Sequence, residues 1–328
     1  MQAAVERLRA KNFSLEKDEF DQEVFAGRLL KFVNQVDPRT LLPKYFFGIS
    51  VDEAQDMLEK FKSREVGYEQ PSDDELWKAR KIVRSTLHPD SGEAILPPFR
   101  MSGFVPFGTP IVVGMLLAQT PAQNVFWQWA NQSHNAAVNY SNRNMSAPSS
   151  TKDIATSYTV AVSSAITVSL IMDRVVKRLR APVLQRFVPF IAVASANILN
   201  VGFMRRMELE SGITVFDEVG KELGQSVMAA KKALAETAVT RVVLPVPILV
   251  LSPLLLMATE KLIPAVKQKP GLRIAAQATL VSCCFMLGLP LSLSLFRERG
   301  TLAISDLEPE LRAKCPSPQG EVYYSKGL

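Results

Sequence analysis

The sequence predicts an all-α membrane protein, a polytopic bundle of about five spanning helices preceded by a soluble helical N-terminal region. Charged residues make up 21% of the 328-residue chain, but they gather in blocks that are separated by long uncharged stretches. A helix needs about 20 apolar residues to cross the ~30 Å hydrocarbon layer. A charge at the centre of that layer costs about 3 kcal/mol or more, so the uncharged stretches are the expected spans.

The expected spans cover residues 101-118, 154-172, 187-204, 242-259 and 274-296. The alternative is a soluble protein with unusually apolar core helices. A soluble helix of this length normally keeps a polar stripe, whereas residues 158-172 and 242-257 are apolar or small on every side. We therefore expect three parts: a soluble region over 1-100, a membrane bundle over 101-296, and a soluble tail over 297-328.

Capping boxes predict where helices of the soluble parts begin. In this motif a Ser oxygen and a Glu carboxylate three residues later satisfy backbone amides of the first turn. It occurs at Ser50 to Glu53, Ser72 to Glu75 and Ser305 to Glu308. The helix expected after Ser72 is amphipathic, and its apolar face holds Leu76, Ala79, Val83 and Leu87.

The formal net charge of +6 comes largely from short connectors between expected spans. The basic residues are not interleaved with aromatic ones, which argues against nucleic acid as a partner. With five spans, the basic connectors at 173-186 and 260-273 lie on the N-terminal side, which the positive-inside tendency places in the cytoplasm or matrix. The first 20 residues mix acidic with basic side chains and have no apolar core, so we expect no cleavable presequence.

Helix-breaking residues interrupt three of the expected spans. They are Gly103, Pro106, Gly108, Pro110 and Gly114 in the first, Pro245, Pro247 and Pro253 in the fourth, and Pro290 in the fifth. Proline frees a backbone carbonyl, which is tolerated at membrane depth only where protein or a water-filled cavity satisfies it. Interrupted helices often form substrate sites in transporters. Kinks that serve only packing are an equally good interpretation of any single proline.

An amide-rich segment, residues 122-144, has almost no charge and is expected to be a half-span or interfacial helix. A spacing of four and three residues places five of its polar side chains along one face: Gln128, Gln132, Asn135, Asn139 and Asn142. Asn131 and His134 lie beside this face. Neutral amides can bond both the carboxylate and the ammonium of a zwitterion without burying an ion, which suits an amino acid as solute. The third span adds Ser195, Asn197 and Asn200 to this candidate substrate-binding set; the alternative is that they hold helices together.

The segment His88, Pro89, Asp90, Ser91, Gly92 and Glu93 contains possible metal ligands. The chain has one other histidine, His134, and its three cysteines lack metal-ligand spacing, so we expect a turn here and no metal or cofactor. No phosphate loop, nucleophile elbow, zinc motif or dinucleotide fingerprint is present. These absences predict that the chain is not an enzyme.

Four long strings in the chain, at 88-93, 100-110, 126-144 and 186-200, together resemble the sideroflexin family. Shorter matches lie at 20-22, 25-28, 37-39 and 324-328, so the resemblance covers nearly the whole chain. QSHN at 132-135 and RVVLPVPIL at 241-249 are most similar to the sideroflexin-5 subgroup. The chain departs from the family pattern at 296-298, at Ser91 and at 42-49.

The resemblance implies a multi-pass protein of the mitochondrial inner membrane that carries small polar solutes. Members of the family are linked to serine and other amino acids, with roles for citrate and iron also proposed. A tricarboxylate carrier is the first alternative, although citrate would call for basic residues within the bundle, which the expected spans lack. The second alternative is a membrane scaffold or assembly factor that acts through the N-terminal region. The expected partners are the lipid bilayer and the solute.

Overall fold

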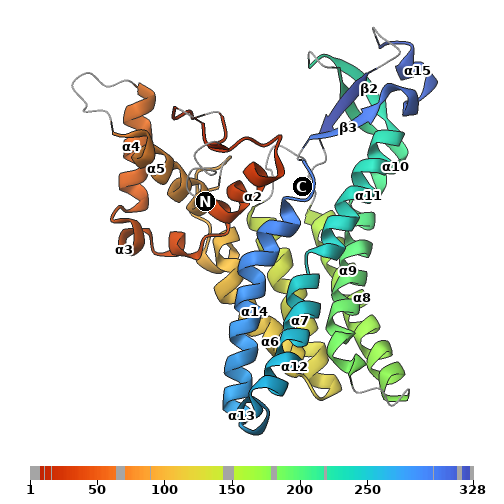
Figure 1. Cartoon of the computed structure of the whole chain (residues 1–328). Helices are drawn as coiled ribbons and strands as arrows, with labels where there is room; N and C mark the ends of the chain where they lie inside the picture. Colours follow the sequence, from red (N-terminus) through yellow and green to blue (C-terminus); the bar gives the residue numbers. More distant parts are fainter. Residues whose placement is uncertain are drawn as a thin grey trace. The chain divides into compact units, whose positions relative to one another are not determined.

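The computed structural model of the chain describes residues 8-10, 12-15, 17-63, 71-88, 90-142, 151-178, 183-217, 220-297, 299-315 and 320-325 (Figure 1). Contacts divide the chain into two units. Unit 1 comprises Met1–Ser149 and Pro247–Ser294, and unit 2 comprises Ser150–Val246 and Leu295–Leu328. The sequence-based division at residues 100 and 296 stays a prediction.

The predicted helical membrane bundle is confirmed. Within the described residues, four helices are long and apolar enough to cross a membrane: Ala155–Arg178, Leu184–Phe203, Val227–Leu262 and Pro270–Leu293. A shorter apolar helix, Met101–Leu117, corresponds to the first expected span. The helix Val227–Leu262 has 36 residues and starts well before residue 242. At 1.5 Å per residue it is about 54 Å long, so part of it extends beyond the hydrocarbon layer.

The N-terminal part of unit 1 is built from short helices. They are α2 (Phe25–Gln35), η1 (Pro38–Leu41), α3 (Pro43–Phe47), α4 (Val51–Ser63) and α5 (Asp73–Thr86). Both predicted capping boxes are present, since Ser50 and Glu53 bond each other's backbone amides, as do Ser72 and Glu75. The predicted face of α5 is confirmed in part. Leu76 and Ala79 are buried against α4 and its flanking loops, and Val83 packs there partly buried. Leu87 follows the last residue of the helix, and Ile82, which was not predicted, is buried as well.

Two helices of unit 1 form an antiparallel hairpin. After the turns η2 (Pro97–Phe99) and η3 (Met101–Gly103) comes α6 (Phe104–Leu117). A three-residue connector follows, and α7 (Pro121–Ser141) begins after a capping box at Thr120. The Asn142 side chain at the end of α7 donates to the carbonyl oxygen of Phe99 at 2.8 Å, before the start of α6. The 21 residues of α7 extend about 31 Å, so this helix is long enough for a full crossing.

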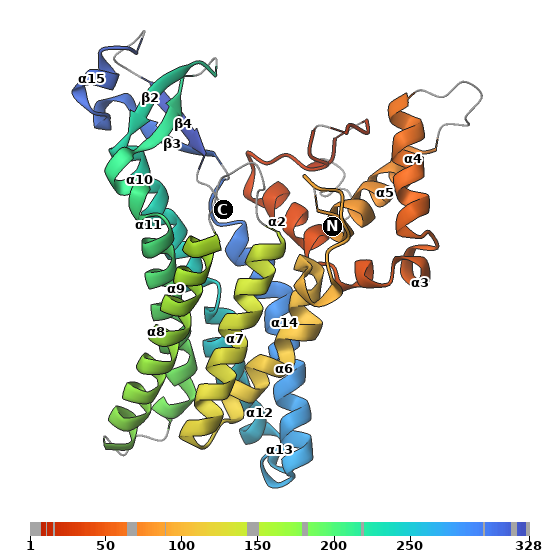
Figure 2. The ribbon, with the colours of Figure 1, turned by 180° about the vertical axis from the view of Figure 1, so that it is seen from behind.

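The hairpin packs against α14 (Pro270–Leu293), which follows α12 (Ser252–Leu262) and α13 (Pro264–Gln268); α6, α7 and α14 lie side by side in Figures 1 and 2. The hydroxyl oxygens of Thr109 and Ser282 are 3.2 Å apart near the middle of α6 and α14. Gly108 allows close approach there, because a Cβ on it would lie 3.2 Å from the Phe285 ring. Within unit 1, α6 therefore runs antiparallel to α14 along much of its length.

The expected sidedness of one connector is wrong. Arg28 of α2 donates to the carbonyl oxygen of Ser294, so the N-terminal helices dock at the C-terminal end of α14. The 260-273 connector precedes α14 and lies at its other end. The N-terminal helices and this connector thus lie at opposite ends of α14. The five-span count took α7 as a half-span or interfacial helix, and a full crossing by this 21-residue helix would reverse the side of every later connector.

Unit 2 contains a helical part and a small sheet (Figure 2). The helical part consists of α8 (Thr151–Arg178), η4 (Leu184–Phe187), α9 (Val188–Met204), α10 (Arg206–Ser211) and α11 (Val227–Val243). The sheet was not expected. Its four antiparallel strands, in the order β2-β1-β4-β3, are β1 (Ile213–Phe216), β2 (Glu222–Ser226), β3 (Arg299–Ala303) and β4 (Glu321–Ser325). Tyr324 is 1% exposed and packs in the sheet core with Val215 and Ala233.

The third predicted capping box is wrong. Ser305 lies within the 3-10 turn η6 (Ile304–Asp306), and the short helix α15 (Pro309–Arg312) begins after Glu308. The carboxylate of Glu308 instead accepts a 2.9 Å bond from the backbone N–H of Met228, in the first turn of α11. The motif had the right residue types, but a longer-range partner of the same chemistry competes for the carboxylate.

Candidate functional site

The most buried polar side chains of α7 are amides. Gln128 is 2% exposed and Gln132 is 4% exposed, and Asn131 is half-buried between them in sequence. Their spacing of three and four residues places them on one face of the helix. Phe126, Trp129 and Tyr140 are each about half exposed. The helix thus buries Gln128 and Gln132 and leaves these three aromatic rings at the surface.

These buried amides have unused hydrogen-bonding atoms. Gln128 Oε1, Asn131 Nδ2 and Gln132 Nε2 have no partner among the described residues. An unpaired buried polar group costs about 1–3 kcal/mol, so such groups need an explanation. One free acceptor and two free donors lie within about 6 Å along the helix axis, at 1.5 Å per residue. This set can receive an ammonium group and a carboxylate group of one small molecule.

The other predicted residues of α7 have different environments. His134 Nε2 lies 3.0 Å from the carbonyl oxygen of Pro98, and Asn142 Nδ2 donates to the carbonyl oxygen of Phe99. Both side chains therefore hold α7 against η2. Asn135 is half-buried and Asn139 is exposed. The amides with buried, unpartnered atoms are therefore Gln128, Asn131 and Gln132, all in the first half of the predicted polar segment.

One further buried amide, Gln277 of α14, was not expected from the sequence. It is 2% exposed, and its Nε2 has no partner among the described residues. Thr109 of α6 contacts Ser282 of α14, and the two helices are antiparallel. Gly114 is five residues after Thr109 and Gln277 is five residues before Ser282, so both lie at a similar level along the helix axes. Its one signal was its place as the single amide in the uncharged stretch 274-296.

The predicted polar residues of α9 belong to unit 2. Asn197 Nδ2 donates to the carbonyl oxygen of Arg241 at 3.0 Å. That carbonyl lies four residues before Pro245, which has no N–H to bond it, so Asn197 replaces the missing helix bond. Asn200 Oδ1 is buried without a partner among the described residues, and Ser195 is half-buried. The α7 and α9 residues thus lie in different units, each of which the structure describes by itself.

The segment from His88 to Glu93 forms the predicted turn. His88 is buried, and its Nδ1 accepts the backbone N–H groups of Asp90 at 3.1 Å and Ser91 at 3.3 Å. The backbone N–H of Gly92 donates to the carbonyl oxygen of His88, with Gly92 at a φ of 70° that favours glycine. Pro89 lies outside the described residues. The imidazole therefore shapes the connection from α5 to the first span.

Comparisons with known proteins agree with this architecture. A family model described as sideroflexins matches residues 14–328. The chain is 46% identical to human Sideroflexin-5 over 325 residues, which cover 96% of this chain and 93% of the human protein. It is 38% identical to Sideroflexin-5 of Caenorhabditis elegans, with 96% of each chain covered. It is 37% identical to rat Sideroflexin-3, with 97% of this chain and 98% of the rat protein covered.

No solved structure matches the chain significantly. The family assignment therefore depends on the sequence matches, which extend over the N-terminal helices, the spans and the tail alike. The chain belongs to the sideroflexin family, and it is a multi-pass membrane protein.

Proposed function

We propose that this chain transports small polar solutes, with amino acids of serine's size as the leading class, across the mitochondrial inner membrane. Family membership and the apolar spans support a transport role of this kind. The observation that carries the proposed solute class is the set of free amide atoms on α7: Gln128 Oε1, Asn131 Nδ2 and Gln132 Nε2. An acceptor next to two donors complements a zwitterion without a fixed protein charge.

The site proposed here is the buried face of α7, with Gln277 of α14 at its edge. Residues 101-142 contain no Lys, Arg, Asp or Glu, so a neutral solute meets no uncompensated charge along the hairpin. The α9 residues Ser195 and Asn200 remain proposed members of the path. Asn197 has a separate structural task, because it bonds the carbonyl freed by Pro245.

Uptake by proteoliposomes tests this proposal. We expect Gln132→Leu to reduce uptake of labelled serine about tenfold or more, since a hydrogen bond to a charged group is worth about 1.5–3 kcal/mol. Asn139→Leu is the matched control, because it removes an exposed amide of the same helix. Equal uptake by wild type and Gln132→Leu would count against the α7 site.

A tricarboxylate carrier is the second candidate, and one observation favours it. Arg241 lies within the candidate span Val227–Leu262, whereas the sequence-based span 242-259 excluded it. A guanidinium at this position could receive a carboxylate. Competition between labelled serine and unlabelled citrate separates the two candidates. Strong competition by citrate that Arg241→Gln abolishes would favour the tricarboxylate carrier.

A further inference from the structure

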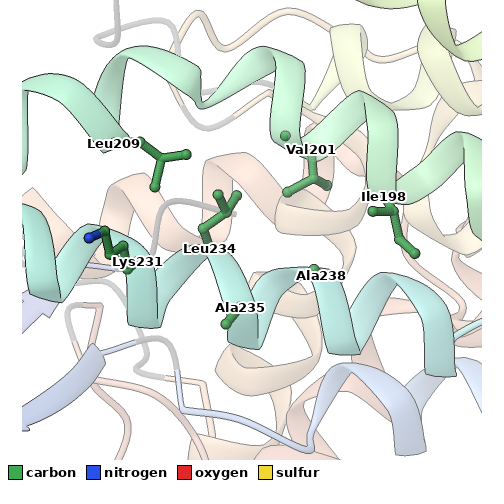
Figure 3. Close-up of a pocket in the computed structure, with 8 residues that line it drawn as sticks. Ile198, Val201, Leu209, Lys231, Leu234, Ala235 and Ala238 are labelled. Atoms are coloured by element: carbon green, nitrogen blue, oxygen red, sulfur yellow. The ribbon is translucent and has the colours of Figure 1, made fainter.

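Unit 2 contains a groove between α9, α10 and one face of α11. Its volume is about 280 Å³. Apart from Lys231 and Gly202, every residue that lines it has an apolar side chain. Ile198, Val201 and Gly202 form one wall, and Lys231, Leu234 and Ala238 form the facing wall. Figure 3 shows Lys231 and Leu209 toward one end of the groove and Ile198 and Ala238 toward the other.

The groove crosses the edge of the membrane-spanning layer. Ile198 and Gly202 belong to the span Leu184–Phe203, and Arg205 and Arg206 begin two residues after its end. Leu209 and Lys231 lie beyond these arginines. The Arg205 guanidinium donates to the hydroxyl of Thr237 at 3.1 Å, so Thr237 marks the level on α11 at which the span of α9 ends. Lys231 lies on one side of Thr237 along α11, and Ala238 lies on the other. One end of the groove is therefore at hydrocarbon depth and the other at headgroup depth.

The two ends offer different chemistry. The Lys231 side chain is exposed, and no ion pair involves it among the described residues, whereas the neighbouring Lys232 donates to the carbonyl oxygen of Thr301 at 2.6 Å. At the other end, a Cβ added to Gly202 would have no heavy atom within 4 Å. The glycine leaves open space between apolar walls. The groove thus combines one unpaired cation with an apolar channel.

We propose that this groove binds an anionic phospholipid, with one acyl chain along the apolar walls and the phosphate group on Lys231 Nζ. Apart from Lys231, the lining side chains provide no polar partner for a small hydrophilic solute. A cation at headgroup depth attracts anionic lipid and raises its affinity about fivefold. The lipid covers apolar surface of α9 and α11 that unit 2 itself leaves open.

Two variants of the full-length purified protein test the site separately. Gly202→Leu fills the open space, and it also replaces a helical glycine with a better helix former, so the fold is not weakened. Lys231→Gln removes the charge alone. The matched controls are Gly271→Leu, a helical glycine with equally open space, and Lys261→Gln, an exposed lysine of α12.

Native mass spectrometry then measures binding of phosphatidylglycerol and phosphatidylcholine with identical acyl chains. Wild type and both controls should prefer phosphatidylglycerol about fivefold. Lys231→Gln should bind the two lipids equally, and Gly202→Leu should lose the tightest bound lipid of either kind. Unchanged lipid binding by Gly202→Leu would show that the groove is not the lipid-binding site. A loss of preference in Lys261→Gln as large as in Lys231→Gln overturns the assigned cation, because it indicates diffuse surface attraction.

Discussion

At the residue scale, one arginine connects the N-terminal region to the membrane bundle. Arg28 is 8% exposed, and its Nε donates to the carbonyl oxygen of Ser294 at 3.1 Å. Its Nη1 donates to the carbonyl oxygens of Gln22 and Glu23, each at 3.0 Å. The guanidinium thus bonds the C-terminal end of α14, where helix carbonyls lack intrahelical partners and carry partial negative charge.

Replacement of Arg28 should weaken this junction strongly. We expect Arg28→Leu to lower the free energy of unfolding by about 3 kcal/mol, because one buried and two partly buried carbonyls lose a charged donor. Arg28→Lys should recover only part of the loss, since an ammonium lacks the planar fork that reaches several acceptors. Thermal unfolding in detergent measures both. A Lys variant as stable as wild type would show that charge alone matters.

A second residue-scale feature is the carboxylate of Asp37. Burial by itself raises its pKa, but hydrogen bonds from Arg39 and Lys81 outweigh burial and lower the pKa to about 2. A carboxyl pKa below the unfolded value of about 3.9 stabilises the fold above that pH. This stabilisation is lost as the pH falls from about 4 through 2.

Asp37→Asn should therefore remove a pH-dependent part of stability. We expect the variant to be less stable than wild type at pH 7, and the difference to shrink as the pH falls from about 4 toward 2. Unfolding midpoints across this range, with the exposed Asp52→Asn as control, provide the measurement. A difference that stays constant down to pH 2 would contradict the ion-pair account.

Residue roles within the amide stripe were only partly predictable. Helical spacing was enough to predict one polar face on α7. It could not separate Gln128 and Gln132, which are buried with free atoms, from His134 and Asn142, which bond η2. That difference depends on where the distant turn Pro97–Phe99 packs, and spacing along one helix does not encode it.

At the element scale, the hairpin of α6 and α7 depends on one close contact. A Cβ on Gly114 would lie 2.2 Å from the Trp127 ring, so only glycine permits this approach. We expect Gly114→Ala to destabilise the protein by about 1–3 kcal/mol, although alanine is the better helix former. Thermal unfolding checks this, with Gly271→Ala as control because its Cβ has open space. Equal midpoints for the two variants would exclude the packing role.

The broken fourth span gives a second element-scale prediction. Asn197 bonds the Arg241 carbonyl that Pro245 leaves free. Asn197→Leu should cost about 1 kcal/mol, which is typical of polar contacts between membrane helices. In a Pro245→Ala background the backbone N–H returns, and the same substitution should cost much less. A double-mutant cycle measures the coupling, and equal costs in both backgrounds would reject this role.

The sheet shows what sequence patterns could not reveal. Its strands have four or five residues each, too short for a clear alternation. β1 pairs with β4, more than 100 residues later in the chain. By contrast, the spans were predictable because each is one long uncharged stretch, and the α5 helix because its cap and apolar face are local. Features encoded by neighbouring residues, such as spans and helix caps, could be predicted from the sequence, whereas the pairing of strands far apart in the chain could not.

At the scale of the whole molecule, the division between units falls at a change in helix geometry. Unit 1 resumes at Pro247, which is also the first residue of the π-helical turn η5 (Pro247–Leu251). In unit 1, the η5 turn packs on α14, where a Cβ on Gly288 would lie 2.4 Å from Pro247 Cβ. Such π-helical turns interrupt regular bonding and often occur at functional sites. The fourth span is thus two helical pieces with different partners.

The central claim is that α7 crosses the membrane and that solute binds its buried amide face. Thiol protection tests this claim directly in a protein whose Cys283, Cys284 and Cys315 are replaced by alanine. In proteoliposomes, Gln132→Cys should react with a water-soluble thiol reagent, and serine should slow that reaction. Ala122→Cys, at an exposed position of the first turn, should react at a rate that serine leaves unchanged. Reaction at residue 132 that proceeds equally fast with and without serine, citrate or other small solutes would contradict the account.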